Sequence, residues 1–453
     1  MTRDEGTPDK PIIPEAIEPE AESAPDLTAA AVEVIPPEIV AQSLGQYLRA
    51  MVARARGGDA GILPVAFALV AVTIAFTIVS PRHVFLSPGN LVNLFDQSAV
   101  FIVLAMGEGF VLLLGEIDLS IGYVAAIGGI VTANMVQPET NWPWWLAIAA
   151  GLLVCAGIGA IHGLIITRLR MPAFVVTLAG FLIWFGVMIV ILGPAGSVGI
   201  ISKIQENQRV LYGIVYAPYI DPLVAWIGLA VIVALLGTTL WLRDAGRRRS
   251  GLVAPPVGLT LAKIGALAVA GIVVVAICNV NRGVFQSVVV GVPWVVPVVL
   301  VVLVAWTMLL ERTPFGRHIY AVGGNAEAAR RAGINVSQVR TLGFVLCSLT
   351  AGVAGVIYAS QLGGMTTNIN GGQLVLYAVA AAVIGGTSLF GGRGRAIHGL
   401  LGGLVIGAIY NGLYLLGLPI QWQLIATGLV LLAAVSVDSL SRRGVTSGSG
   451  ARA

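Results

Sequence analysis

Long apolar segments separated by short polar ones run through most of the chain. A helix needs about 20 apolar residues to cross the hydrocarbon core of a bilayer. Segments near that length lie at 62–80, 96–114, 119–136, 144–166, 172–192, 222–242, 262–280, 287–310, 339–361, 374–391, 396–416 and 420–438. The pattern predicts an all-α, polytopic membrane protein with twelve transmembrane helices. The boundaries around 96–136 are the softest, because two carboxylates interrupt the apolar run.

The two ends of the chain differ from this membrane region. Residues 1–37 are acidic and rich in proline, so they bury too little apolar surface to fold, and we expect a disordered cytoplasmic tail. Residues 38–60 place apolar side chains at helical spacing beside arginines, which predicts an amphipathic helix on an anionic membrane surface. A solvated lead-in is the alternative there. The transmembrane domain is expected at 61–440, followed by a cytoplasmic tail at 441–453.

Composition supports the membrane class and the positions of the charges predict an orientation. The chain is 57% hydrophobic and 11% charged, whereas soluble proteins carry about 25% charged residues. With the N-terminus in the cytoplasm, 22 of the 26 lysines and arginines fall on the cytoplasmic side. That bias predicts that both termini are cytoplasmic, and it explains the net charge of +4 without nucleic acid as a partner. The four basic residues outside are Arg82, Lys203, Arg209 and Arg282.

The first motif is Gly-Glu-Ile-Asp-Leu-Ser-Ile-Gly at 115–122, between two apolar segments. Ionised groups at membrane depth are costly, so Glu116 and Asp118 should face protein or water. Asp118 or Ser120 can cap the helix that follows. The break either lines a polar pathway or forms a tight turn at the inner face, and the spacing leaves both open. Tyr123 would narrow the pathway if it faced it.

Three amides near the ends of apolar segments are further pathway candidates. Each has the chemistry to contact a polyhydroxylated substrate, but such residues also serve hydrogen bonds between helices. They are Asn134, Gln361 and Asn370.

The second motif is the glycine-rich stretch Gly385–Gly394. It lacks the Gly-Lys-Ser/Thr that a phosphate-binding loop requires, so we expect no ATP site in this chain. Cys155, Cys278 and Cys347 lie inside apolar segments and are expected to be small buried hydrophobes. The histidines show no ligand spacing. The sequence therefore predicts no metal, no cofactor and no enzymatic activity.

The third motif is the polar segment 315–334, which carries three arginines between apolar spans. Residues 327–332 favour a helix, Gly333 is a natural stop, and Gly323-Gly324-Asn325 is expected to be a flexible lead-in. A short rigid helix at the inner face can transmit a push from a soluble partner, although an interfacial helix without a partner fits as well. The candidate coupling residues are Gly324, Asn325, Glu327, Ala328, Ala329, Arg330 and Gly333.

The motifs at 115–122, 316–333 and 385–394, in this order, resemble the sugar-permease family of bacterial ATP-binding-cassette importers, which contains ribose and D-xylose permeases. The resemblance covers about 62–438, and the apolar segments at 222–310 are most similar to the D-xylose subgroup. It implies the permease fold of these importers, a homodimer in the bacterial inner membrane, ATP bound by a cytoplasmic ATPase subunit, and an extracytoplasmic sugar-binding protein. The expected cargo is D-xylose or a related aldose.

A twelve-helix, ion-coupled secondary sugar transporter is the alternative. Its two cytoplasmic termini and basic central loop are matched by the predicted topology and by residues 243–263. The Gly-Arg turn of such proteins is echoed at Gly316-Arg317, but its counterpart between the second and third spans is replaced by the motif at 115–122. An intramembrane enzyme would need a nucleophile, an acid and a base in one place, and no such set stands out.

Overall fold

The structure is a computed structural model that describes residues 45–46, 63–192, 202–203, 209–216, 219–252, 254–283, 287–367, 369–419, 421–429 and 432. The tails expected at 1–37 and 441–453 lie outside these residues. So does nearly all of the amphipathic helix expected at 38–60.

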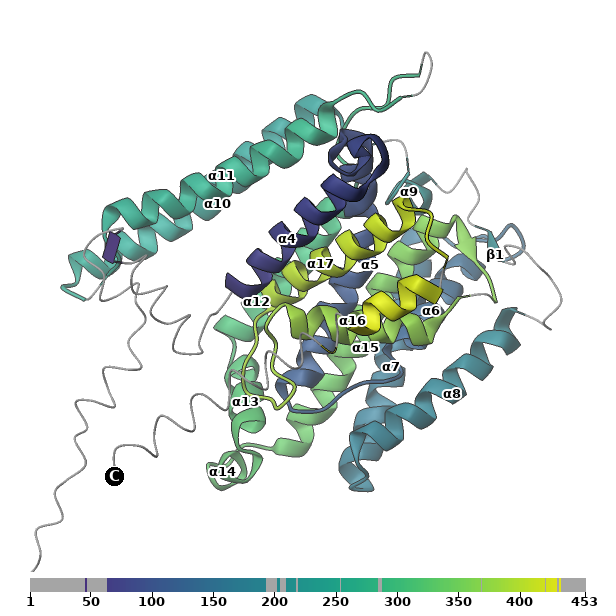
Figure 1. Cartoon of the computed structure of the whole chain (residues 1–453). Helices are drawn as coiled ribbons and strands as arrows, with labels where there is room; N and C mark the ends of the chain where they lie inside the picture. Colours follow the sequence, from purple (N-terminus) through teal and green to yellow (C-terminus); the bar gives the residue numbers. More distant parts are fainter. Residues whose placement is uncertain are drawn as a thin grey trace, which may run out of the picture.

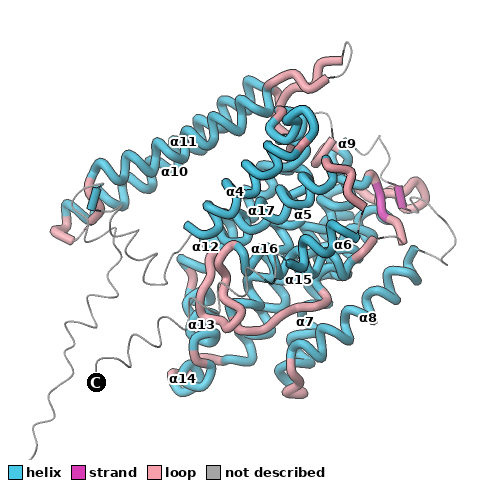
Figure 2. The backbone as a smooth tube through the Cα atoms, viewed as in Figure 1, coloured by secondary structure: helices cyan, strands magenta, loops and turns pink. Residues whose placement is uncertain are grey.

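Helices make up almost all of the described chain (Figures 1 and 2). Their order is α4 (Leu63–Val79), η1 (Pro81–Leu86), α5 (Pro88–Leu113), α6 (Ile121–Met135), α7 (Trp144–Arg168), α8 (Ala173–Leu192), α9 (Arg209–Tyr212), α10 (Pro222–Arg249), α11 (Val257–Asn279), α12 (Val295–Arg312), α13 (Pro314–Gly324), α14 (Ala326–Arg331), α15 (Val336–Leu362), α16 (Gly371–Ile384) and α17 (Ala396–Leu415). Strands β1 (Ser202–Lys203) and β2 (Gly364–Met365) pair antiparallel.

Eleven of the twelve predicted spans overlap one of these helices, although the span at 287–310 begins eight residues before α12 and the span at 374–391 runs seven residues past α16. Within the described residues, eight helices are long and apolar enough to cross a membrane, and α4, α6 and α16 are shorter. For the twelfth span, residues 421–429 are helical, and most of the remainder is not described. The start of α5 differs from the prediction, because the helix begins at Pro88 and not at residue 96. Ser87 caps it by accepting a hydrogen bond from the Asn90 amide, and proline suits a first turn.

The core of the bundle is formed by α5, α6, α7, α15, α16 and α17 (Figure 1). α15 packs against α5, α6 and α7, while α5 also packs along α17. Small residues let these backbones approach closely. A methyl group placed on Gly355 of α15 would lie 1.9 Å from the Ala125 carbonyl of α6. All three cysteines are buried and free, which confirms the prediction that they are small buried residues.

Helices α10 and α11 form a hairpin that leans away from this bundle (Figure 1). It is rooted where Ile220 pairs with Val292, beside the start of α12. There Ala225, Val275 and Cys278 share an apolar cluster with Val292 and with Val92 of α5. The rest of the hairpin is largely exposed, which fits a surface that lipid covers.

The two shortest helices of the core start side by side. α6 has 15 residues and α16 has 14, which correspond to lengths of about 22 and 21 Å. Gly122 of α6 touches the carbonyl of Gly371 in α16. From there α6 runs toward β2, because Gly129 faces Met365. α16 runs toward α13, where the chain that follows it contacts Leu113 and Gly323. The two helices are thus shorter than the hydrocarbon core, which is about 30 Å thick, and they point away from a common start.

Candidate functional site

The common start of α6 and α16 lies well inside the bundle. A methyl group on Gly122 would lie 2.0 Å from the Gly371 carbonyl oxygen, so neither helix tolerates a side chain at this contact. Just before α6, Asp118 lies against Cys347 of α15, with 3.9 Å between Oδ2 and Sγ. Cys347 stands eleven residues beyond the first residue of α15, a rise of about 17 Å. The start therefore falls near the middle of a hydrocarbon core of about 30 Å.

Asp118 organises the break between α5 and α6. Its Oδ1 accepts hydrogen bonds from the Ser120 amide at 2.8 Å and the Ser120 hydroxyl at 2.6 Å. Its own amide donates to Glu108 Oε1 of α5 at 3.0 Å. All three side chains are fully buried in protein, as expected for carboxyl groups at this depth. The expected cap is only partly correct: Ser120 is the N-cap residue of α6, but its side chain caps no helix amide.

The network continues through residues that the sequence analysis did not select. The Ser120 hydroxyl lies 3.4 Å from His162 Nδ1 in α7, and Trp184 of α8 donates to His162 Nε2 at 3.0 Å. Glu108 and His162 could have been found in the sequence by their position inside apolar spans, where ionisable residues are rare. Their partnership could not be inferred, because it joins four separate helices. The chain of contacts ties α5, α6, α7 and α8 together at one depth.

Glu116 lies at the edge of the same break that faces the start of α15. It forms an ion pair with Arg340 at 2.8 Å, near the start of α15. The pair uses one oxygen and one nitrogen, since Glu116 Oε2 and Arg340 Nε have no hydrogen-bond partner among the described residues.

Tyr123 is buried and closes one side of the common start. Its ring lies 4.8 Å from that of Phe181 and 4.9 Å from that of Phe185, both on α8. It also packs against Gly371. The large side chain is therefore accommodated by a glycine on the facing helix. In the single chain Tyr123 fills the core, and it does not line an open channel.

Asn370 is exposed at the start of α16 and caps that helix. Its Oδ1 accepts from the Gln373 amide at 3.0 Å. Next to it, Gly372 faces the Phe181 ring, and Gln373 donates from its side chain to the Tyr377 hydroxyl at 2.6 Å. An accessible amide beside an aromatic ring is thus present at the depth of the break.

The remaining two pathway candidates are not part of this arrangement. Asn134 is in the last turn of α6, and Gln361 is in the last turn of α15. The Gln361 carbonyl accepts from the Tyr216 hydroxyl at 2.7 Å. Both therefore lie at the end of the bundle that carries β1 and β2. The structure brings Glu116, Asp118, Ser120, Tyr123 and Asn370 together around the break and leaves the other two apart.

The coupling candidates form a short, capped helix at the opposite end of the bundle. Asn325 caps α14 by accepting from the Ala328 amide at 2.9 Å. α14 ends at Arg331, and Gly333 follows in the left-handed region at φ 84°, which confirms it as the stop. Ala329 is buried on the inner side, while Glu327 pairs with Arg330 on the outer side at 2.6 Å. Arg331 joins this exposed cluster at 3.3 Å from Glu327.

The flexible lead-in expected at 323–325 is not observed. Gly323 and Gly324 complete α13, a second helix that the sequence analysis did not predict. A methyl group on Gly323 would lie 1.7 Å from the Leu113 carbonyl of α5. Gly323 therefore serves close packing, whereas a β-carbon on Gly324 would meet no atom within 4 Å. Only Asn325 separates α13 from α14.

The three sequence motifs meet at this point, in a contact that we term the glycine joint: Gly115, Gly323, Gly391 and Gly392 with Leu113. The Gly392 amide donates to the Leu113 carbonyl at 2.9 Å. Gly391 lies against the backbones of both Gly115 and Gly323. Nearby, the Tyr320 hydroxyl donates to the Gly394 carbonyl at 2.7 Å, and Arg395 pairs with Glu311 at 2.6 Å. The α13–α14 unit, the break and the loop after α16 are thus one connected structure.

Known proteins resemble the chain over most of its length. Residues 90–435 match the family described as "Branched-chain amino acid transport system / permease component". The xylose transport system permease protein XylH of Escherichia coli (strain K12) is 34% identical over 380 residues, which cover 83% of this chain and 91% of that protein. The ribose import permease protein RbsC of the same strain is 32% identical, over 82% and 92%.

A third relative is the D-allose transport system permease protein AlsC of the same strain, 31% identical over 83% of this chain and 90% of that protein. No solved structure matches the chain. The family match spans the break, the α13–α14 unit and the loop after α16 together. The chain therefore belongs to this family of transport-system permeases, with the xylose, ribose and allose permease proteins among its relatives.

Proposed function

We propose that this chain is the permease subunit of an ATP-binding-cassette importer that moves a monosaccharide, D-xylose or a related aldose, across the bacterial inner membrane. The family match and the names of the three relatives support the class of cargo. Two copies form the path, a separate cytoplasmic subunit binds ATP, and an extracytoplasmic protein delivers the sugar. Both termini are cytoplasmic, so the α13–α14 end of the bundle faces the cytoplasm.

The glycine joint carries the mechanical part of this proposal. α14 presents the exposed Glu327, Arg330 and Arg331 to a partner, while Ala329 anchors it in the apolar cluster beneath. A displacement of α14 passes through the single residue Asn325 to α13, and from Gly323 to the end of α5. The break follows directly, so motion at the partner surface reaches Asp118 through backbone contacts. Rigid elements with two arrangements are the usual means of such coupling.

The cargo path is proposed to pass Asn370 and Gln373. Their side-chain amides donate to and accept from sugar hydroxyls at the start of a discontinuous helix. The Phe181 ring lies beside this position and offers an apolar face. The exposed side of α8, including Leu178 and Leu182, would face the second copy across the path. No covalent chemistry is required of any of these residues.

Uptake in vesicles tests this function against ion-coupled transport, which the family match does not favour. Vesicles contain the chain, its ATPase and ATP, and the sugar-binding protein is added outside. We expect accumulation of labelled xylose to persist when an ionophore collapses the proton gradient, and to stop when ATP is omitted. Accumulation by the chain alone, driven by the gradient, would overturn the proposal.

A further inference from the structure

The hairpin of α10 and α11 extends beyond the thickness of the apolar core. α10 has 28 residues, so it is about 42 Å long, against about 30 Å for the hydrocarbon core. Arg243 stands about 32 Å and Arg249 about 40 Å from the first residue, Pro222. Because the start of α10 is fixed at the root of the hairpin, its last two turns lie among lipid headgroups even at a tilt of about 20°.

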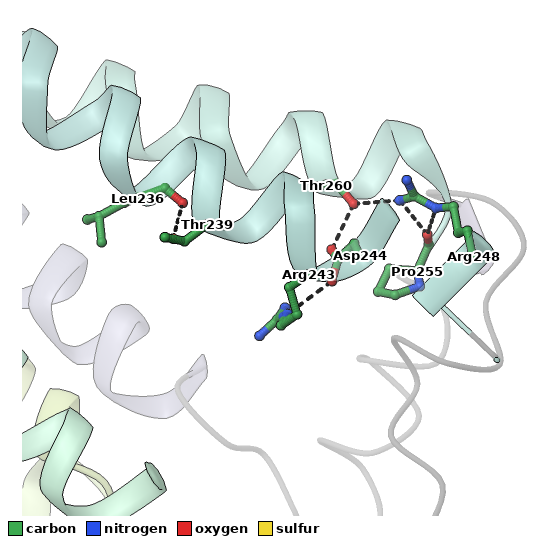
Figure 3. Close-up of polar contacts among 7 residues, drawn as sticks. All are labelled: Leu236, Thr239, Arg243, Asp244, Arg248, Pro255 and Thr260. Atoms are coloured by element: carbon green, nitrogen blue, oxygen red, sulfur yellow. Dashed lines mark hydrogen bonds and ion pairs between the residues drawn. The ribbon is translucent and has the colours of Figure 1, made fainter. Parts of the chain in front are cut away.

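A buried polar network fixes the shape of this free end (Figure 3). Asp244 is buried and accepts from the Thr260 hydroxyl of α11 at 2.9 Å. Arg248 donates to Thr260 at 2.9 Å and holds the Pro255 carbonyl with two nitrogens, at 2.9 and 3.1 Å. Arg243 donates to the other Asp244 oxygen at 3.1 Å. Arg248 and Asp244 thus clasp the two helices through Thr260 and Pro255, and Asp244 also holds one nitrogen of Arg243.

Two arginines remain available after the clasp is formed. Arg247 and Arg249 make no ion pair within the described residues. Arg243 adds a third guanidinium, whose side chain is still half exposed. The site is therefore a rigid, cationic helix end, preorganised because Arg248 and Asp244 hold the turn.

The surroundings of these arginines are apolar. Leu242 is 64% exposed, Leu252 is 60% exposed and Leu261 is 54% exposed. Leu242 and Leu252 lie within three residues of an arginine in sequence, and Leu261 follows Thr260, which bonds Arg248. Trp241 is next to Leu242 in α10, and the Arg248 guanidinium lies 6.0 Å from the centre of its ring. Tryptophan is enriched at the boundary between acyl chains and headgroups. A ligand here needs both a negative head and an apolar tail.

We propose that the free end of the α10–α11 hairpin binds the headgroup of an anionic phospholipid through Arg247, Arg249 and Arg243. The phosphodiester accepts from the guanidinium groups, which suit phosphate geometry, and the acyl chains lie along the exposed leucines. On the proposed orientation the lipid belongs to the cytoplasmic leaflet. A soluble protein partner fits less well, because the exposed leucines continue the lipid-facing surface of α10.

Native mass spectrometry of the full-length chain in detergent tests this site without any transport partner. Phosphatidylglycerol is titrated against neutral phosphatidylcholine. Arg247→Gln with Arg249→Gln should weaken phosphatidylglycerol binding roughly 25-fold, because each surface arginine contributes about a fivefold effect. Phosphatidylcholine binding should not change. The control Arg168→Gln with Arg170→Gln removes the same charge from the turn after α7 and should keep phosphatidylglycerol binding.

Three outcomes would overturn the lipid site. Equal losses in both double variants would show a general charge effect, and displacement of the lipid by inorganic phosphate alone would show that the apolar surface contributes nothing. Unchanged lipid binding combined with lost ATPase association would assign the arginines to a protein partner. Because lipid binding is measured on the chain alone, its failure leaves the proposed transport function untouched.

Discussion

Single glycines decide whether the common start of α6 and α16 can form. A β-carbon on Gly371 would lie 2.5 Å from the Tyr123 ring, closer than packing allows. On the neighbouring Gly372 it would lie 3.3 Å from the end of the Phe181 ring, a contact that a small side-chain shift relieves. Both positions are glycine, but only Gly372 has room for a larger side chain.

Gly371→Val is therefore expected to lower the stability of the purified chain by about 1–3 kcal/mol, the usual cost of overpacking. Gly372→Ala, the matched control, should leave the midpoint of thermal unfolding nearly unchanged. The measurement is a melting curve of each variant in the same detergent. Equal midpoints for Gly371→Val and the unaltered chain would contradict the contact between Tyr123 and Gly371.

Asn370 has two separable roles, as a helix cap and as a proposed contact for the sugar. Asn370→Ser keeps a capping hydroxyl but removes the amide, so the KM for sugar uptake should rise about fivefold, as expected for one lost hydrogen bond. The control is Asn335→Ser, because Asn335 caps α15 through the same bond, to the Gln338 amide at 3.0 Å. An unchanged KM in Asn370→Ser would remove this residue from the path.

At the scale of elements, α14 is a surface helix whose charges contribute little to folding. Its ion pairs are exposed, and such pairs are worth about 1 kcal/mol or less. Its inner side, by contrast, is anchored by Ala329 in the same apolar cluster as Leu113 and Ile319. Substitution of the exposed charged residues of α14 should therefore not displace the helix from the bundle.

Glu327→Arg should abolish coupling while the protein still inserts and folds. The variant places three arginines together, and such like-charge crowding at an interface should reduce ATP-driven uptake about tenfold or more. Glu139→Arg, an exposed position between α6 and α7, is the control and should transport normally. Uptake by Glu327→Arg at the original rate would dismiss α14 as the coupling helix.

The sequence predicts those elements whose pattern of residues is local, and it does not predict contacts between distant segments. Hydropathy located eleven membrane helices because each span is apolar on its own account. α13 was missed, since Gly323-Gly324 is typical of a flexible link. The packing role of Gly323 depends on Leu113, which is far away in sequence. For the same reason the motifs at 115–122 and 385–394 were recognised separately, whereas their contact through Gly115 and Gly391 was not.

For the whole molecule, the proposed path requires a second copy against α8. Leu182 of α8 and Leu235 of α10 are exposed almost equally, at 64% and 63%. Exposure alone thus does not separate a surface that faces a second copy from one that faces lipid. What distinguishes α8 is that its Phe181 lies against Gly372, next to Asn370 at the start of α16.

Leu182→Cys is accordingly expected to cross-link two chains in membranes treated with an oxidant. Leu235→Cys should stay monomeric under the same conditions, and the three natural cysteines are buried and do not compete. Denaturing electrophoresis without reductant gives the readout. Cross-linking through Leu235 in place of Leu182 would relocate the interface to the hairpin.

The glycine joint is made almost entirely from backbone atoms, as in the bond from the Gly392 amide to the Leu113 carbonyl. Backbone contacts have no rotamers, so this contact cannot absorb a displacement by a change of side-chain conformation. On the proposed function, a small displacement of α14 by the ATPase subunit would then reach the break at Asp118 with little loss. Thermal motion of nearby side chains should change the distances between these backbone atoms little. The number of sugars imported per ATP hydrolysed should therefore stay constant over a wide temperature range.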